Sequence, residues 1–465
     1  MIFQGLDLSV KNVPKYDPEF TPFAKFISAY AAAVKAFDGK KAVKIALERE
    51  NGQISVYETA VFGDCAHAEL DRLYMERLCK ALLWMRGGFR FTICGAPCLA
   101  EYIKAQYAEG GSRAFDADFM AGVYEHAFEV VAADYDKCPV PLELTKTVGR
   151  HLNGCRIGFD AGGSDRKVSA VVDGEAIFSE EVVWLPKVNP DPEYHYQGIL
   201  DAFKSAAAKM PRVDAIGVSS AGIYVANQTM VASLFKAVAK DDFDAKVKDI
   251  YIRAAKAIGE DIPLEVANDG DVTALAGAMD LNDNRVLGIA MGTSEAGGYV
   301  DAAGNITGWL NELAFVPVDL NPASMVDEWS GDYGCGVKYF SQDCAIKLAP
   351  AAGVELADDA TPAEKLKAVQ KLMLENDERA KGIYESIGCY LASGLALYAE
   401  FYDIKHVLLM GRVVSGEGGN IILAEARRIL AEDYPEIADK LELHLPDENS
   451  RRVGQSVAAA SLPEA

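Results

Sequence analysis

The part of the chain after Cys155 shows the same order of secondary structure twice. Apolar runs first predict strands over 156–160, 167–173 and 176–182, a helix over 196–209, a strand over 214–219, a helix over 247–258 and a strand over 263–267. From Arg285 they predict strands over 286–291, 297–300 and 306–309, a helix over 379–402, a strand over 406–410, a helix over 421–431 and a strand over 441–444. Each half must bury its own sheet. We therefore expect two α/β lobes with a cleft between them, over residues 151–284 and 285–465, with an insertion over 302–376.

Residues 1–150 follow a different pattern and form a separate expected module. A strand pair surrounds the turn Glu50-Asn51-Gly52, and a helix over 68–85 precedes a strand over 89–94 and a helix over 100–107. This α+β module carries no chemical signature. We expect a structural or dimer-forming role for it, with a lid over the cleft as the alternative.

Composition excludes several classes of protein. The chain has 465 residues, a net charge of −23 and no cluster of Lys and Arg, so we expect no nucleic-acid partner. No apolar run approaches the ~20 residues of a membrane helix, and no signal peptide is recognisable. Nine scattered cysteines suit reduced thiols, so the expected location is the cytoplasm.

The first motif of chemical interest is a glycine-rich hairpin that follows a strand ending in Asp160. Gly162, Gly163 and Ser164 allow phosphate groups to approach backbone N–H groups closely, and Lys167 lies in the next strand. Asp160 is a candidate ligand for a hydrated Mg²⁺ ion. An ordinary hairpin turn is the competing interpretation.

The second half of the chain repeats this arrangement at Gly292, Thr293 and Ser294. Two such loops, each opening one α/β half, could hold a polyphosphate from both sides. A further glycine-rich bend follows the predicted strand over 406–410, and Gly411 there is a candidate contact for an adenosine. A plain strand–helix connection is the alternative at Gly411.

Asp269 is the candidate catalytic base. It follows Asn268 at the end of the predicted strand over 263–267, where a carboxylate can accept a proton from a hydroxyl nucleophile. The alternative role is an N-cap of the helix that follows, and Asp271 is better spaced for that cap.

Read in order, these motifs resemble the ROK family (repressors, open reading frames and kinases) of the sugar-kinase and actin superfamily, over about residues 155–465. The resemblance implies an actin-like ATPase (ribonuclease H-like) fold, ATP and Mg²⁺ as cofactors, and a sugar or polyol as substrate. Asp269 would deprotonate a sugar hydroxyl that then attacks the γ-phosphate. The segment around Asn227 is similar to the family's sugar-side loop, which makes Asn227 and Asn268 candidate sugar contacts.

Two departures from the family concern its sugar and zinc motifs. In the family's Glu-x-Gly-His motif, Glu and His hold the sugar and His also ligates zinc; here Glu312 remains and Phe315 replaces the histidine. The cysteine-rich loop keeps Cys335, and with Cys344 alone it cannot supply four ligands. We therefore expect no zinc site.

Three functions remain open from the sequence. The leading one is an ATP-dependent kinase for a sugar or sugar-like polyol. The first alternative is a non-catalytic sugar or nucleotide sensor, and the second is an actin-type ATPase or scaffold. The sequence leaves the oligomeric state open, a homodimer included.

Overall fold

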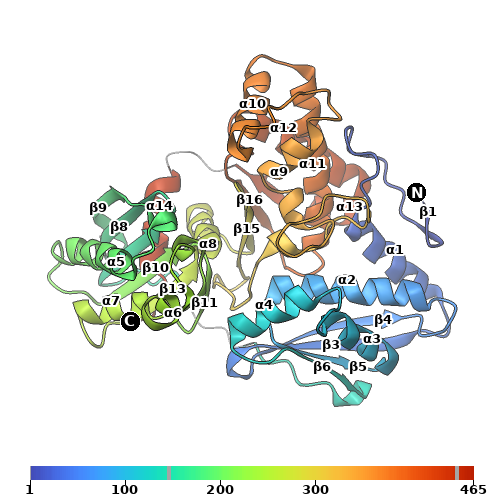
Figure 1. Cartoon of the computed structure of the whole chain (residues 1–465), viewed down its shortest axis with the longest axis horizontal. Helices are drawn as coiled ribbons and strands as arrows, with labels where there is room; N and C mark the ends of the chain where they lie inside the picture. The colour runs from blue at the N-terminus through green and yellow to red at the C-terminus, as the bar shows by residue number, and fades with distance from the viewer. Residues whose placement is uncertain (1, 144–147, 446–449) are drawn as a thin grey trace.

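The computed structural model describes residues 2–143, 148–445 and 450–465. Figure 1 shows three parts: an N-terminal module in blue, a first lobe in green on the left, and a second lobe in yellow and orange above the module. No helix within these described ranges has both the length and the apolar content needed to cross a bilayer.

The first lobe contains a five-stranded sheet in the order β13-β10-β7-β8-β9. Its strands are β7 (Cys155–Ala161), β8 (Asp165–Val172), β9 (Glu175–Val183), β10 (Ala215–Ser220) and β13 (Leu264–Asn268). β7, β8 and β9 are antiparallel neighbours, whereas β7, β10 and β13 run parallel. Helices α5 (Pro192–Ala207) and α7 (Ile250–Ile258) pack together beside this sheet. β10 is buried along its whole length, as expected for a parallel strand covered on both faces.

The C-terminal helix α14 (Ser450–Ala460) returns to the first lobe and packs against β7, β8 and β10 (Figure 1). Two glycines allow this close approach. A Cβ atom at Gly158 would lie 1.8 Å from the carbonyl oxygen of Ser456, and one at Gly217 would lie 1.7 Å from that of Ala459. The helix also contacts α8 (Asp269–Leu281).

The second lobe contains a four-stranded sheet in the order β15-β14-β16-β17. The strands are β14 (Val286–Met291), β15 (Glu295–Val300), β16 (His406–Met410) and β17 (Glu442–His444), with helices α9 (Gln342–Leu348), α10 (Pro362–Leu374), α11 (Glu378–Tyr398), α12 (Glu417–Asp433) and α13 (Pro435–Ala438). α11 is buried over most of its length and packs on α12.

The strand expected over 306–309 is absent from this sheet, and that prediction is wrong. Only an isolated bridge joins Val300 and Ile306. The segment that follows serves another element instead, because the backbone N–H groups of Leu310, Asn311 and Glu312 donate to the last carbonyl groups of a helix in the N-terminal module. Helix ends leave such carbonyl groups without partners inside the helix.

That helix is α2 (Ala68–Arg86), which lies between the N-terminal sheet and the second lobe (Figure 1). The sheet has the order β4-β3-β5-β6, with strands β3 (Lys41–Glu48), β4 (Ile54–Val61), β5 (Arg90–Cys94) and β6 (Glu129–Ala133). Helices α1 (Phe23–Ala36), α3 (Pro97–Tyr107) and α4 (Ala114–Tyr124) complete the module. Its hydrophobic core is continuous with that of the second lobe.

The remaining short elements lie at the edges of these parts. They are β1 (Ile2–Phe3), β2 (Leu6–Asp7), β11 (Ile223–Val225), β12 (Gln228–Val231) and α6 (Lys240–Asp242). β11 and β12 form a hairpin that follows β10 and reaches β13.

The packing of α14 gives a stability prediction. Gly217→Ala should lower the free energy of unfolding by about 1–3 kcal/mol, because the added Cβ overlaps backbone atoms of α14. Gly122→Ala is the matched control: Gly122 lies within α4 with open space around it, so alanine there should stabilise by about 0.5–1 kcal/mol. Urea unfolding measures both. Equal stability of the Gly217 variant and the wild type would contradict the close packing.

Candidate functional site

Two carboxylates lie at one edge of the first lobe's sheet because its parallel strands are in register. Asp160 pairs with Ser219 across β7 and β10, and Ser220 pairs with Asn268 across β10 and β13. Asp269 follows Asn268 directly. The backbones at Asp160 and Asp269 are therefore separated by about two strand spacings, roughly 10 Å across the sheet. The Ser219 hydroxyl donates to Asp160 Oδ1 over 3.1 Å.

The carboxyl groups near this edge share one electrostatic environment. Burial, together with the charge of Asp269, raises the pKa of Asp160 to about 6. Burial and the charge of Asp269 raise the pKa of Glu312 to about 7. Burial also raises the pKa of Asp269, while backbone N–H groups at the start of α8 and the charge of Lys187 oppose that rise. A cation placed among these groups would relieve their repulsion.

The first glycine-rich loop joins β7 to β8 and is held by Trp184. The indole Nε1 of Trp184 donates to the Gly162 carbonyl over 2.7 Å, and its backbone N–H donates to the Ser164 carbonyl over 3.1 Å. The Ser164 hydroxyl donates to Asp165 Oδ2 over 2.9 Å, and Lys167 Nζ lies 3.3 Å from Asp165 Oδ1. The two polar side chains expected to contact phosphate therefore both pair with Asp165.

Lys187 is a cation at this loop that sequence reasoning missed. A Cβ atom at Gly163 would lie 3.0 Å from Lys187 Nζ, so the exposed ammonium group stands directly over the glycine turn. Its charge also acts on Asp269. Lys187 lies in the short 3₁₀ turn Pro186–Val188, which follows Trp184. In the sequence, the only feature that could have indicated its role is a basic residue next to a proline after the third predicted strand.

The second loop and the Gly411 bend meet at the ends of β14 and β16. These strands are parallel and in register, and Gly292 N–H donates to the Ser294 carbonyl over 3.0 Å. Thr293 and Ser294 are exposed. Gly411 has a φ of +95°, and a Cβ atom there would lie 2.4 Å from the Met291 carbonyl oxygen. The bend therefore packs directly against the strand that leads into the loop.

Asn268, and not Asp271, caps helix α8, so the cap expected from Asp271 is wrong. Asn268 Oδ1 accepts from Gly270 N–H over 2.8 Å, and its Nδ2 donates to the Gly222 carbonyl over 2.7 Å. The carboxylate of Asp271 instead accepts from the Tyr299 N–H and from Asn311 Nδ2. Asn268 stands immediately before the helix with extended backbone, which is the geometry that a cap needs.

Asn227 is held by the edge of β13. Its Nδ2 donates to the Leu264 carbonyl over 2.9 Å, and its Oδ1 accepts from Val266 N–H over 2.8 Å. Asn227 and Asn268 therefore both position backbone segments around the site.

Glu312 and Phe315 are placed by the N-terminal module. The Glu312 N–H donates to the Trp84 carbonyl at the end of α2 over 3.0 Å. The Phe315 ring stacks on the Trp84 ring with centroids 4.1 Å apart. Phe315, which the sequence resemblance aligns with the family's histidine, therefore packs into the module.

The loop around Cys335 holds buried cations and does not fit a zinc ion. Asp332 accepts from Arg77 Nη1 over 2.8 Å, from Lys80 Nζ over 2.7 Å and from Arg113 Nη2 over 2.8 Å. Lys80 Nζ lies 3.7 Å from Cys335 Sγ. Burial raises the pKa of the Cys335 thiol to about 11. Glu76 and Asp116 also pair with these cations, so the cluster is balanced in charge, and an ammonium group instead of a metal ion lies beside the protonated thiol.

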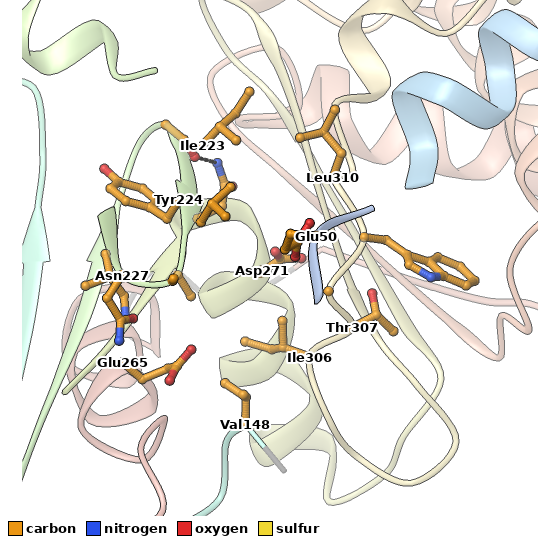
Figure 2. A pocket seen from close by; sticks show the side chains of 18 of the residues that line it. Glu50, Val148, Ile223, Tyr224, Asn227, Glu265, Asp271, Ile306, Thr307 and Leu310 are labelled. Carbon is orange, nitrogen blue, oxygen red and sulfur yellow. Dashed lines mark hydrogen bonds between the residues drawn. The ribbon is translucent and has the colours of Figure 1, made fainter. Parts of the chain in front are cut away.

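A pocket of about 260 Å³ lies between the three parts of the chain. Figure 2 shows Tyr224 and Asn227 on one side and Thr307 and Leu310 on the other, with Glu50 of the N-terminal module between them. Glu50, Glu265 and Asp271 contribute carboxylates, and the described lining residues include no Lys or Arg. The pocket therefore favours neutral or positively charged ligands.

Comparison with known proteins places the fold. No protein-family model and no curated protein matches the chain. The chain is similar to a ROK hexokinase from Thermus thermophilus, with a TM-score of 0.51 and 18% identity over 66% of this chain and 97% of that chain. It is also similar to a ROK family transcriptional regulator, a homolog of the E. coli MLC protein, with a TM-score of 0.50 and 16% identity over 67% of this chain and 79% of that chain. The predicted α/β fold with two actin-like lobes is confirmed.

The raised carboxyl pKa values predict how stability depends on pH. Burial raises the pKa of Asp271 from 3.8 to about 8, so the folded chain holds this proton more tightly than the unfolded chain does. That contribution favours folding below about pH 4 and is lost as pH rises towards 8. Asp271→Asn should therefore gain stability relative to the wild type between pH 5 and pH 8.

Urea unfolding at pH 5 and pH 8 measures this gain. The control is Asp280→Asn, at the exposed far end of α8. Its free energy of unfolding should differ from that of the wild type by the same amount at both pH values. A constant difference between the Asp271 variant and the wild type would contradict the buried-carboxyl account.

Proposed function

We propose that the chain is an ATP-dependent kinase of the ROK kind, which transfers a phosphoryl group to a hydroxyl of a sugar or sugar-like polyol. One observation carries the proposal: Asp160 near the end of β7 and Asp269 directly after β13 lie at one edge of the sheet, and Lys187 lies over the glycine loop with its charge acting on Asp269. This combination of a carboxylate, a base and a cation suits phosphoryl transfer.

The phosphate side of the site fits MgATP. Backbone N–H groups of the glycine turn at Gly162 and Gly163, together with Lys187, are suited to hold phosphate oxygens. Asp160 fits a hydrated Mg²⁺ ion, because its Oδ1 is oriented by Ser219 and its raised pKa reflects burial and the unrelieved repulsion from Asp269. When bound, Mg²⁺ neutralises phosphate charge. In the proposal, the β-phosphate and adenosine bind where the neighbouring parallel strands β14 and β16 end. The backbone there belongs to Gly292, Thr293, Ser294 and Gly411.

Asp269 acts as the general base in this proposal. It accepts the proton of the acceptor hydroxyl, whose oxygen bonds to the γ-phosphorus of ATP as the bond to the bridging oxygen breaks and ADP leaves. Burial keeps the pKa of Asp269 above its ordinary value, which improves a carboxylate as a base near neutral pH. In the proposal, Glu312, whose backbone N–H donates to the end of α2, would orient acceptor hydroxyls.

The acceptor side includes the pocket beside Asn268 and Asp271. The side chains of Asn268 and Asn227 hold its walls in place, and the N-terminal module supplies Glu50. Glu50 Oε2 is buried and has no hydrogen-bond partner among the described residues. A ligand with a hydroxyl or ammonium donor would satisfy that oxygen.

A non-catalytic sugar sensor is the second candidate function. The observation that favours it is Asp165, whose carboxylate occupies both Ser164 and Lys167 within the phosphate loop and would repel phosphate. Lys187 opposes this charge from the other side of the loop.

The role of Asp269 is tested by Asp269→Asn. We expect kcat to fall by roughly 10²–10⁴-fold with little change in affinity for a non-hydrolysable ATP analogue, as for loss of a general base. ADP release is measured with the best acceptor from a panel of hexoses, amino sugars, deoxy sugars and polyols. Asp280→Asn on the same helix is the control and should keep full activity. Equal losses of ATP binding and turnover would assign Asp269 a structural role.

The charge of the pocket predicts which acceptors bind. In the presence of the ATP analogue and Mg²⁺, glucose and glucosamine should raise the melting temperature and glucuronate should not, since the pocket lining includes Glu50 and Glu265 and, among the described residues, no Lys or Arg. Glu50→Gln should reduce the advantage of glucosamine over glucose, because it removes a buried negative charge. If glucuronate raised the melting temperature as much as glucose does, the acceptor would not bind in this pocket.

A further inference from the structure

A group of two histidines and a glutamate lies on the second lobe's sheet, away from the proposed site. β16 and β17 are parallel, with His406 paired to Glu442 and Leu408 paired to His444. Because side chains alternate along a strand, Glu442 and His444 project from the same face. Their ligand atoms and that of His406 all lie within 4.8 Å of one another.

The two imidazoles face each other through nitrogen atoms. His406 Nδ1 and His444 Nε2 are 3.0 Å apart, and His406 Nδ1 lies 3.5 Å from a Glu442 carboxylate oxygen. Two ligands at about 2.0–2.1 Å from a tetrahedral zinc ion would be about 3.4 Å apart. The observed separation suits a direct hydrogen bond between the rings, and metal ligation requires the two nitrogen atoms to move apart by about 0.4 Å.

Asp283 anchors the other ring nitrogen of His406. Its carboxylate lies 3.1 Å from His406 Nε2, on the opposite side of the ring from His444, and it is itself paired with Lys405. A carboxylate in this position keeps the proton on Nε2 and directs the lone pair of Nδ1 towards His444 and Glu442. Histidines that ligate metals characteristically donate their other N–H to a carboxylate in this way.

Against the expectation from the sequence motifs that the chain has no zinc site, we propose that His406, His444 and Glu442 bind one divalent transition-metal ion, zinc by preference, with water as a fourth ligand and Asp283 as the residue that orients His406. Two imidazoles and a carboxylate suit zinc, which is normally four-coordinate. The nearby cations have other partners: Lys405 pairs with Asp283, and Arg427 donates to the Leu443 carbonyl.

The position of the group indicates a structural role for the ion. His406 begins β16, and Gly411 follows its end, so the metal site and the proposed nucleotide site are about 16 Å apart along the strand. β17 is only three residues long, Glu442–His444, and two of them would be ligands. The ion would therefore fasten this edge strand to the sheet.

Cobalt substitution tests the site in the full chain. After chelator treatment and dialysis, one equivalent of Co²⁺ should produce visible d–d absorption, and zinc should displace it. His444→Gln and Glu442→Gln change partly or largely exposed positions, so folding should survive; the first should abolish the spectrum and the second should weaken binding. Asp283→Asn should lower affinity by roughly 10–100-fold.

His67→Ala is the matched control, because His67 forms a similar pair with Asp64, at 2.8 Å, outside the group. It should bind Co²⁺ like the wild type. A second readout is the melting temperature, which a chelator should lower in the zinc-loaded wild type and leave unchanged in His444→Gln. If the wild type did not bind Co²⁺, or if the spectrum of His444→Gln were unchanged, the metal site would be refuted and the two histidines would only form a hydrogen bond.

Discussion

The parallel register of β7, β10 and β13 is the constraint on which the proposed site depends. It carries Asp160 and Asp269, far apart in sequence, to the same edge of one sheet. The register is maintained from behind by α14, whose backbone lies so close to β7 and β10 that only glycine fits at positions 158 and 217. A displacement of either strand would separate Asp160, the proposed Mg²⁺ ligand, from Asp269, the proposed base.

The N-terminal module fixes the opposite side of the cleft. The last carbonyl groups of α2 accept the N–H groups of residues 310–312, and the ring of Trp84 accommodates Phe315. Although burial raises the pKa of Asp332, the adjacent Arg77, Lys80 and Arg113 together hold it well below its ordinary range. Removing one partner from such a buried cluster typically costs about 3–5 kcal/mol. In this chain, buried cations of the module thus organise the loop that the sequence resemblance aligned with the family's cysteine-rich zinc loop.

The sequence predicted most strands and helices of both lobes, because each is a long apolar run bounded by glycine or a cap residue. It failed where the element depends on distant partners. Residues 306–309 have the composition of a strand, yet the neighbouring amides pair with α2. Asp271 has the spacing of a cap, yet Asn268 fills that position. Lys187 and the pair His406–His444 carry no recognisable spacing, since only the fold brings them to their neighbours.

The central claim is that the cleft transfers the γ-phosphoryl group of ATP to a hydroxyl, and following that group is its most direct test. The wild-type chain would be incubated with γ-labelled ATP, Mg²⁺ and a mixture of neutral and amine-bearing sugars and polyols, and the labelled products separated. The account predicts label on a small-molecule acceptor, with little release as inorganic phosphate. Label that remains entirely on ATP, or that appears only as inorganic phosphate, would contradict it and would favour the sensor or the ATPase respectively.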